Sequence, residues 1–420
     1  MTLIAILCAY TLVFVGISAV QINFLKKEKA KKAVILDEKT YQEAANIAIA
    51  NEKFAIFSHF YSLVLSVAWL LWGFAWLKGC VIGEPATLAN AADTAFATAA
   101  NATPSTASAG STLENTLFLL AFLIINTLLS LPLSAYKAFV KDKKHGFSTI
   151  TPALFIKDSL KNLALLAVFG FLFLYVLLLC YEFLGTWWWL GASGVAFAVC
   201  LIIIVIYPTL IVPLYNKMQP LQDEALQGEI SQLLNKCGFS SKGVFVMDAS
   251  KRDKRLNAYF GGLSKCKRVV LFDTLLKTFD AKQLLAVLGH ELGHFVHKDL
   301  LKGLFSSALM MFLLFFVFAH LPEFFYKESH LDGVNAGVFA LLIMFNGVFD
   351  LLFSPLINAM SRKNEFAADR YGAKMTSSKD MREALLVLAK ENKAFIKASR
   401  LYALFHHSHP SIDERLKALA

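Results

Sequence analysis

The chain has 420 residues, of which 57% are hydrophobic and only 17% are charged, and phenylalanine occurs 37 times. This apolar excess is too large for the core of a water-soluble protein, so the composition predicts an integral membrane protein. The net charge of +10 does not indicate nucleic-acid binding, because the basic residues flank apolar stretches and form no basic and aromatic surface. Attraction to anionic lipid headgroups accounts for this charge.

Seven apolar stretches have the length that crosses a bilayer. They lie near 3–22, 55–77, 115–135, 161–183, 187–212, 303–321 and 334–356. No basic residue precedes the first stretch and several lysines follow it, so an uncleaved anchor is expected rather than a signal peptide.

The loops between these stretches predict an orientation. Residues 23–54 and 136–160 are rich in lysine, whereas 78–114 has Lys78 as its only basic residue. Because lysine-rich short loops stay in the cytoplasm, we expect the N-terminus outside and both 213–302 and the C-terminus inside. Residues 83–112 are dominated by Ala, Thr, Ser and Asn, a composition typical of a flexible extracytoplasmic loop.

A small sheet is predicted between the fifth and sixth spans. Three runs rich in β-formers, 244–247, 256–260 and 268–272, are separated by turn-rich or charged residues and favour an antiparallel arrangement. The run around Asn257 and Ala258 is a candidate edge strand that could hold a peptide by main-chain hydrogen bonds. A plain structural hairpin is an equally good interpretation of this run.

The motif His290-Glu291-Leu292-Gly293-His294 follows this sheet. Asp280 is a good N-cap and Gln283 completes a capping-box spacing, so the motif is expected on a helix. Two histidines four residues apart then share one face and can bind one metal ion, while the glutamate can deprotonate the attacking water. This chemistry suggests peptide-bond hydrolysis. The alternative is that the two histidines have no catalytic role and only pack against neighbouring residues or face solvent.

Two histidines leave a catalytic zinc short of one protein ligand. His297 lies on roughly the same helical face as His290. Its spacing from His294 is tight for a third ligand, which favours a role as a hydrogen-bond partner of a ligand or as a surface histidine. The pattern HExxHxxGxxH is excluded, because His297 and Leu300 occupy its glycine and third-histidine positions. Glu365 and Asp369 are four residues apart, so one carboxylate can bind zinc while the other receives a ring N–H of a ligand histidine. A solvated acidic pair is the alternative.

The chain resembles the membrane-embedded CAAX prenyl proteases of the Ste24 type, within the M48 family of zinc metallopeptidases. The resemblance covers nearly the whole chain. It rests on seven spans, Pro213-Leu214-Tyr215-Asn216-Lys217, Asn257-Ala258-Tyr259-Phe260, the motif from His290 to His294, the Ser-Arg-x-x-Glu-x-x-x-Asp pattern from Ser361 to Asp369, and His409-Pro410 with Arg415.

The resemblance implies a zinc site and the residues that serve it. It implies that His290, His294 and Glu365 bind one zinc ion. Glu291 would be the general base that activates water and then passes the proton to the leaving amine. Asp369 resembles the partner of a ligand histidine.

Further residues are implied to act on the substrate. His409 resembles a histidine that stabilises the oxyanion, with Arg415 nearby to orient the site or the substrate, although Arg415 could equally be a structural ion-pair partner. The pair Asn257-Ala258 matches a segment that lines the substrate backbone. Spacing alone does not say whether His406, His407 or His409 faces the metal.

The expected fold is mostly helical. Seven transmembrane helices around an intramembrane chamber are implied by the resemblance, with a small α+β cytoplasmic protease region. We expect five membrane helices in 1–212, the zinc-protease region in 213–302, two further membrane helices in 303–357, and a cytoplasmic segment in 358–420 that completes the active site.

The expected function is zinc-dependent hydrolysis of peptide bonds near the C-terminus of prenylated or membrane-associated proteins. A membrane quality-control peptidase without prenyl specificity is the alternative. A non-catalytic transporter or scaffold is disfavoured, because a structural zinc site is normally closed by four ligands, often cysteines, and none lies near the motif. The compact lysine-rich loops suit a bacterial inner membrane, and no oligomer is implied.

Overall fold

A computed structural model describes residues 1–83, 110–239, 241, 243–261 and 268–420. Within these ranges, seven helical segments are long and apolar enough to cross a membrane. They are Thr2–Lys29, Glu38–Val81, Thr112–Lys144, Pro152–Phe183, Gly185–Tyr215, Asp299–Ala319 and Gly337–Met375. The predicted helical, polytopic fold is confirmed. The flexible loop predicted for 83–112 falls almost entirely outside the described residues.

The helical segments are longer than the apolar stretches predicted from sequence, because hydropathy registers only the part of a helix that lies in lipid. Several are interrupted by one π-helical turn. In chain order the first five comprise α1 (Thr2–Lys29), α2 (Glu38–Ala68), η1 (Trp69–Gly73), α3 (Phe74–Val81), α5 (Thr112–Tyr136), η2 (Lys137–Lys141), α6 (Asp142–Lys144), α7 (Pro152–Leu165), η3 (Leu166–Gly170), α8 (Phe171–Phe183), η4 (Gly185–Trp187), α9 (Trp188–Ile206), η5 (Tyr207–Ile211) and α10 (Val212–Tyr215).

The remaining elements form the soluble region, the last two spans and the C-terminal segment. They are β1 (Met218–Pro220), α11 (Glu224–Lys236), β2 (Val244–Met247), η6 (Ala249–Lys251), β3 (Ala258–Gly261), β4 (Arg268–Phe272), α12 (Asp273–Thr278), α13 (Ala281–Val296), α14 (Asp299–Ala319), α15 (Glu323–Glu328), α16 (Gly337–Met375), α17 (Ser378–Glu391), α18 (Arg400–His406) and α19 (Ile412–Ala418).

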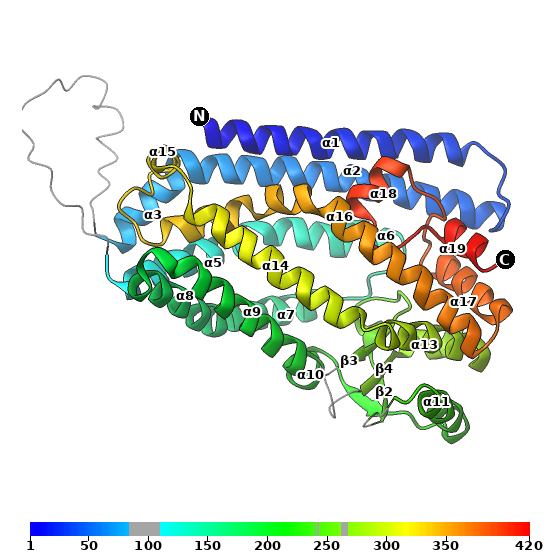
Figure 1. The fold of residues 1–420 in the computed structure, drawn as a ribbon. Coiled ribbons are helices and arrows are strands. Elements are labelled where there is room, and N and C mark those ends of the chain that lie inside the picture. The colour runs from blue at the N-terminus through cyan, green and yellow to red at the C-terminus, as the bar shows by residue number, and fades with distance from the viewer. Residues whose placement is uncertain (84–109, 240, 242, 262–267) are drawn as a thin grey trace, which may run out of the picture.

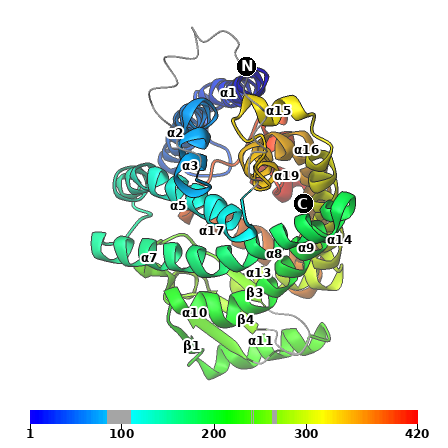
Figure 2. The same cartoon turned by 90° about the vertical axis from the view of Figure 1, so that its left-hand side faces the viewer.

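The long helices run lengthwise beside one another, with the sheet, α13 and α17 at the same end of the bundle as the C-terminus (Figure 1). Viewed end-on, the helices form a ring (Figure 2). One buried aromatic cluster, which includes Trp69, Phe118, Trp188 and Phe339, joins helices of this ring. A second cluster joins α11, the sheet, α13, α17 and α19. The membrane and soluble regions therefore each have a core of their own.

The sheet corrects the antiparallel arrangement predicted from sequence. Its strand order is β1-β2-β4-β3, so β4 lies between β2 and β3 and pairs with β2 in parallel. β3 and β1 pair antiparallel with their neighbours. The reason is burial: β4 carries the fully buried Val269, Val270 and Leu271 and takes a central position. β3 is left at the edge, as predicted for the run around Asn257.

α16 is a single helix of 39 residues that carries both a membrane span and Glu365. The domain boundary predicted at 357/358 falls inside it. One continuous helix therefore joins the candidate membrane span to Glu365, without a loop between them.

Candidate metal centre and active site

The helix that carries the histidine motif is fixed at its start and along one face. The Asp280 carboxylate accepts a hydrogen bond from the backbone N–H of Gln283 at 2.8 Å, and the capping box is complete, as predicted. Leu284, Leu288 and Leu292 recur every four residues and are almost fully buried. Because they anchor this face of α13 in the soluble core, the histidines are turned toward α16.

Glycines let α13 and α16 touch through their backbones. A Cβ atom at Gly372 would lie 2.9 Å from the backbone nitrogen of His290, and one at Gly293 would lie 2.8 Å from Cα of Ala368. Both distances are shorter than side chains tolerate. This close approach brings Glu365, two turns before Gly372, up to the histidines.

Three side chains from these two helices converge. Nε2 of His290 and Nε2 of His294 are 3.2 Å apart. The Glu365 carboxylate lies 3.4 Å from the first of these nitrogens and 3.3 Å from the second. Within the described residues, this trio is the group of side chains that could hold a metal ion.

The donor set fits zinc. Zinc–nitrogen bonds of about 2.0–2.1 Å at a tetrahedral angle place two ligand nitrogens about 3.3 Å apart, close to the separation of the two Nε2 atoms. Two imidazoles and one carboxylate are also the ligands of a catalytic site that keeps a fourth position open. The residues present could therefore bind a catalytic metal ion.

A carboxylate and an arginine hold the first histidine. Nδ1 of His290 lies 2.8 Å from Oδ1 of Asp369, so an N–H there directs the Nε2 lone pair at the metal position. Arg415 donates to both oxygens of Asp369, at 2.8 and 2.6 Å. All three side chains are buried. Burial lowers the pKa of His290, but the hydrogen bonds to Asp369 and Glu365 together outweigh burial, so the pKa is raised.

A second carboxylate holds the other histidine, and the sequence-based predictions missed it. Oδ2 of Asp299 lies 2.9 Å from Nδ1 of His294, and Lys302 donates to its Oδ1 at 2.7 Å. Burial is outweighed by the Glu365 and Asp299 carboxylates, which raise the pKa of His294 to about 9. The only sign of this contact in the sequence is an acidic residue, Asp299, five positions after His294. Only the turn through Lys298, with its positive φ of 57°, brings it back to the histidine.

Glu291 lies on α13 between the two histidines. Burial raises the pKa of its carboxyl group, and the charges of His290 and His294 oppose this rise. A carboxyl group whose pKa is raised holds a proton more readily, which suits it to accept a proton and release it again.

The histidines near the C-terminus, His406, His407 and His409, lie in different environments in the folded protein. Nε2 of His409 lies 3.2 Å from Oε1 of Glu365, whereas the ring of His406 packs against Phe14. Arg362 on α16 donates 2.7 Å hydrogen bonds to the carbonyls of Ala403 and His407 and fixes this segment. Of the three candidates, the structure therefore brings His409 to the centre.

Two further candidates lie farther out. His297 follows α13, outside the converging trio, and its ring packs edge-on against Tyr371. Asn257 precedes the edge strand β3, and its carbonyl accepts a hydrogen bond from the backbone of Phe272 at 3.2 Å. Backbone N–H of Ala258 donates to the Asn257 side chain. The edge position of β3 leaves one side of this strand available to pair with an added strand.

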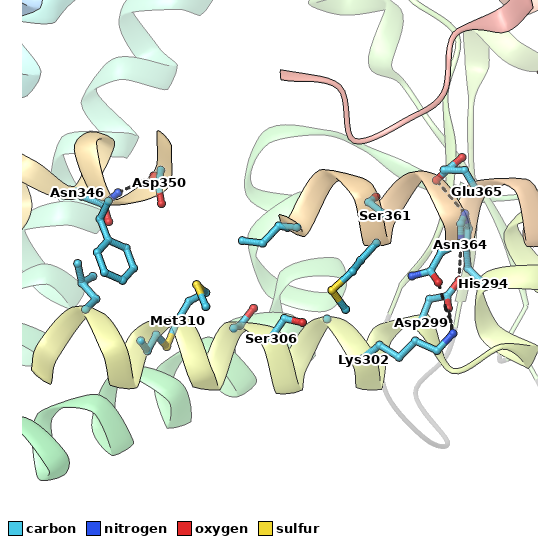
Figure 3. Close-up of a pocket in the computed structure, with 17 residues that line it drawn as sticks. His294, Asp299, Lys302, Ser306, Met310, Asn346, Asp350, Ser361, Asn364 and Glu365 are labelled. Atoms are coloured by element: carbon cyan, nitrogen blue, oxygen red, sulfur yellow. Dashed lines mark hydrogen bonds and ion pairs between the residues drawn. The ribbon is translucent and has the colours of Figure 1, made fainter. Parts of the chain in front are cut away.

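A cavity of about 560 Å³ extends from this centre between α14 and α16. Its two walls face one another in Figure 3, with His294, Asp299 and Glu365 at one end and Asn346 and Asp350 at the other. Between these ends the apolar side chains of Met310, Met311, Leu314, Phe349, Ile357 and Met360 contribute most of the lining surface, and Lys302, Ser306, Ser307, Ser361 and Asn364 add polar groups. The candidate metal centre thus opens into an apolar space along two membrane helices.

Comparisons with known proteins agree with this architecture. Residues 21–217 match the family model "CAAX prenyl protease N-terminal, five membrane helices", and residues 220–420 match "Peptidase family M48". CAAX prenyl protease 1 of Saccharomyces cerevisiae is 32% identical over 405 residues, which cover 91% of this chain and 86% of that protein. The human CAAX prenyl protease 1 homolog is also 32% identical, over 73% of each chain.

A solved structure extends the similarity to the whole fold. The crystal structure of S. mikatae Ste24p superposes with a TM-score of 0.87 at 28% identity, and covers 99% of this chain and 98% of that one. The predicted resemblance, fold and enzyme class are confirmed, and the non-catalytic interpretation is not supported. The chain belongs to peptidase family M48 and is an integral-membrane, multi-pass metalloprotease of the CAAX prenyl protease type.

Proposed function

We propose that this protein hydrolyses peptide bonds near the C-terminus of prenylated, membrane-associated proteins, with one zinc ion per chain. The observation that carries the proposal is the apolar cavity that leads from the metal-binding trio along α14 and α16. A peptide whose lipid tail lay in this cavity would have its backbone held beside the trio.

His290, His294 and Glu365 would hold the zinc ion, supported by the convergence of their donor atoms. Zinc would supply Lewis acidity that polarises the scissile carbonyl and lowers the pKa of the attacking water. Glu291 would accept the proton of that water and donate it to the leaving amine. No covalent intermediate with the enzyme is expected.

Other residues would position these groups and the substrate. Asp369 and Arg415 would orient His290, a role supported by their hydrogen bonds; direct substrate binding by Arg415 stays a prediction. His409 would donate a hydrogen bond to the oxyanion, supported by its place beside Glu365. The backbone at Asn257 and Ala258, at the sheet edge, would pair with the substrate as an added strand.

We propose that the metal centre faces the cytoplasm and that the N-terminus lies outside. This orientation is supported by the lysine-rich loops, which lie toward the same side as the soluble region. Membrane lipids would surround the seven spans. Location in a bacterial inner membrane stays a prediction from loop composition.

The test is cleavage of matched CAAX peptides, with and without the prenyl group, by purified protein in detergent. Chelator-sensitive cleavage of the prenylated peptide, restored by zinc, is expected. Equal cleavage of both peptides would contradict prenyl specificity and favour a general membrane peptidase. No cleavage of either peptide by zinc-loaded protein would contradict the substrate class.

A pair of variants tests the cavity itself. Met310→Trp narrows the cavity, whereas Leu309→Trp adds the same bulk at the neighbouring exposed position. The first variant should raise KM for the prenylated peptide and leave the unprenylated one unchanged, and the second should change neither. Identical kinetics for the two variants would argue against a lipid tail in this cavity.

A further inference from the structure

A second cavity, of about 1070 Å³, lies between α2 and the segment from α5 to α6. None of its lining residues lines the cavity beside the metal centre. Aromatic and aliphatic side chains, among them Phe54, Phe57, Leu133 and Val140, form much of its wall. Three lysines, Lys53, Lys141 and Lys144, belong to the same lining.

The charges of this lining are not balanced. Nζ of Lys141 lies 2.8 Å from Oδ1 of Asp142, and the lining carboxylate Glu43 pairs with Lys393 at 2.7 Å. No ion pair within the described residues neutralises Lys53 or Lys144. Both lysines are exposed, so their positive charges are accessible to a ligand that enters the cavity.

The lysines lie at the level where lipid headgroups are expected. Lys53 lies two residues before the apolar stretch 55–77, and Lys141 and Lys144 lie six and nine residues after the apolar stretch 115–135. The basic end of the cavity thus lies at or outside the end of the hydrocarbon region, and its apolar lining, with Phe57 and Leu133, continues into that region. Lysines at such a boundary hold their ammonium groups at the headgroups while their stems pack on apolar surface.

We propose that this cavity binds one anionic glycerophospholipid, whose phosphate contacts Lys53 and Lys144 and whose acyl chains lie against the apolar wall. Charge complementarity selects an anionic headgroup over a zwitterionic one. The combination of uncompensated lysines with adjoining apolar surface selects a lipid over a free phosphate ion, which would gain nothing from the aromatic wall. The bound lipid would fill the space between α2 and α5.

The experiment is native mass spectrometry of the detergent-purified full chain titrated with phosphatidylglycerol or phosphatidylcholine of identical acyl chains. The wild-type protein should retain phosphatidylglycerol preferentially. Lys53→Gln/Lys144→Gln should bind it about 30-fold more weakly, because each lysine near an anionic headgroup contributes about fivefold. Lys26→Gln/Lys27→Gln, which removes two lysines at the end of α1, is the matched control and should bind as the wild type does.

A third variant separates the cavity from its charges. Ala50→Trp fills the lining and leaves every lysine in place, so it should also lose retained phosphatidylglycerol, with thermal unfolding as the check that it folds. Retention of phosphatidylglycerol by both cavity variants would overturn the proposal. So would equal retention of the two lipids by the wild type, or displacement of the lipid by equimolar glycerol phosphate, which would identify a site for a soluble anion.

Discussion

Nδ1 of His294 lies 2.9 Å from Oδ2 of Asp299, so the second motif histidine is oriented by the first residue of the next membrane helix. His290 is oriented in the same way by Asp369, 2.8 Å away on α16. The two histidines are thus held by carboxylates from the two helices that also line the apolar cavity. The proposed metal centre is thus built onto α14 and α16 as well as α13, and a shift between these helices would disturb both histidines.

Asp299→Asn should weaken zinc binding about 10- to 100-fold, because an amide holds the imidazole of His294 less firmly and makes it a weaker ligand. Competition with a zinc-chelating dye measures this change. Asp332→Asn, an exposed position near the opposite end of the bundle, is the control and should bind zinc normally. Unchanged affinity in Asp299→Asn would remove Asp299 from the site.

Glu291→Gln should keep zinc and lower kcat by about 10²- to 10⁴-fold, since an amide cannot accept the proton of the attacking water. Metal content by mass spectrometry and single-turnover cleavage measure the two effects separately. Glu323→Gln, on the exposed helix α15, should leave both unchanged. Substantial turnover by zinc-loaded Glu291→Gln would exclude Glu291 as the base.

Gly372→Ala should destabilise the protein by about 1–3 kcal/mol, as expected for overpacking at a close helix contact. The new methyl group would lie 2.9 Å from the backbone nitrogen of His290 and would push α16 away from α13. Lower zinc content should accompany the loss of stability, because Glu365 moves with α16. Gly228→Ala, where a Cβ meets nothing within 4 Å, is the control in the same thermal-unfolding and metal assays.

His409→Ala should lower kcat about 10²- to 10³-fold with zinc retained, the effect typical of removing one oxyanion donor. His406→Ala should have a much smaller effect on kcat, because that ring packs against Phe14 rather than beside Glu365. Equal losses in the two variants would show that the histidines act through the stability of this segment instead. Cleavage rates measured at saturating substrate distinguish these outcomes.

The sequence alone determined the membrane fold and the metal-binding motif. Long apolar stretches can satisfy their backbone hydrogen bonds in lipid only as helices. The seven membrane-spanning helices could therefore be predicted from the apolar stretches of the sequence. The capping box at Asp280 and the spacing of His290 and His294 fixed a helix that presents both imidazoles on one face. These are local properties, set by neighbouring residues and by the periodicity of a helix.

Tertiary structure alone decided the strand order, the identity of the histidine beside Glu365 and the role of Asp299. The central position of β4 depends on which strand buries most apolar surface, a comparison between strands that no single run contains. The place of His409 depends on Arg362, whose hydrogen bonds join residues more than forty positions apart. Asp299 reaches His294 only through a left-handed turn at Lys298, because backbone direction between two helices is set by their packing and not by local spacing.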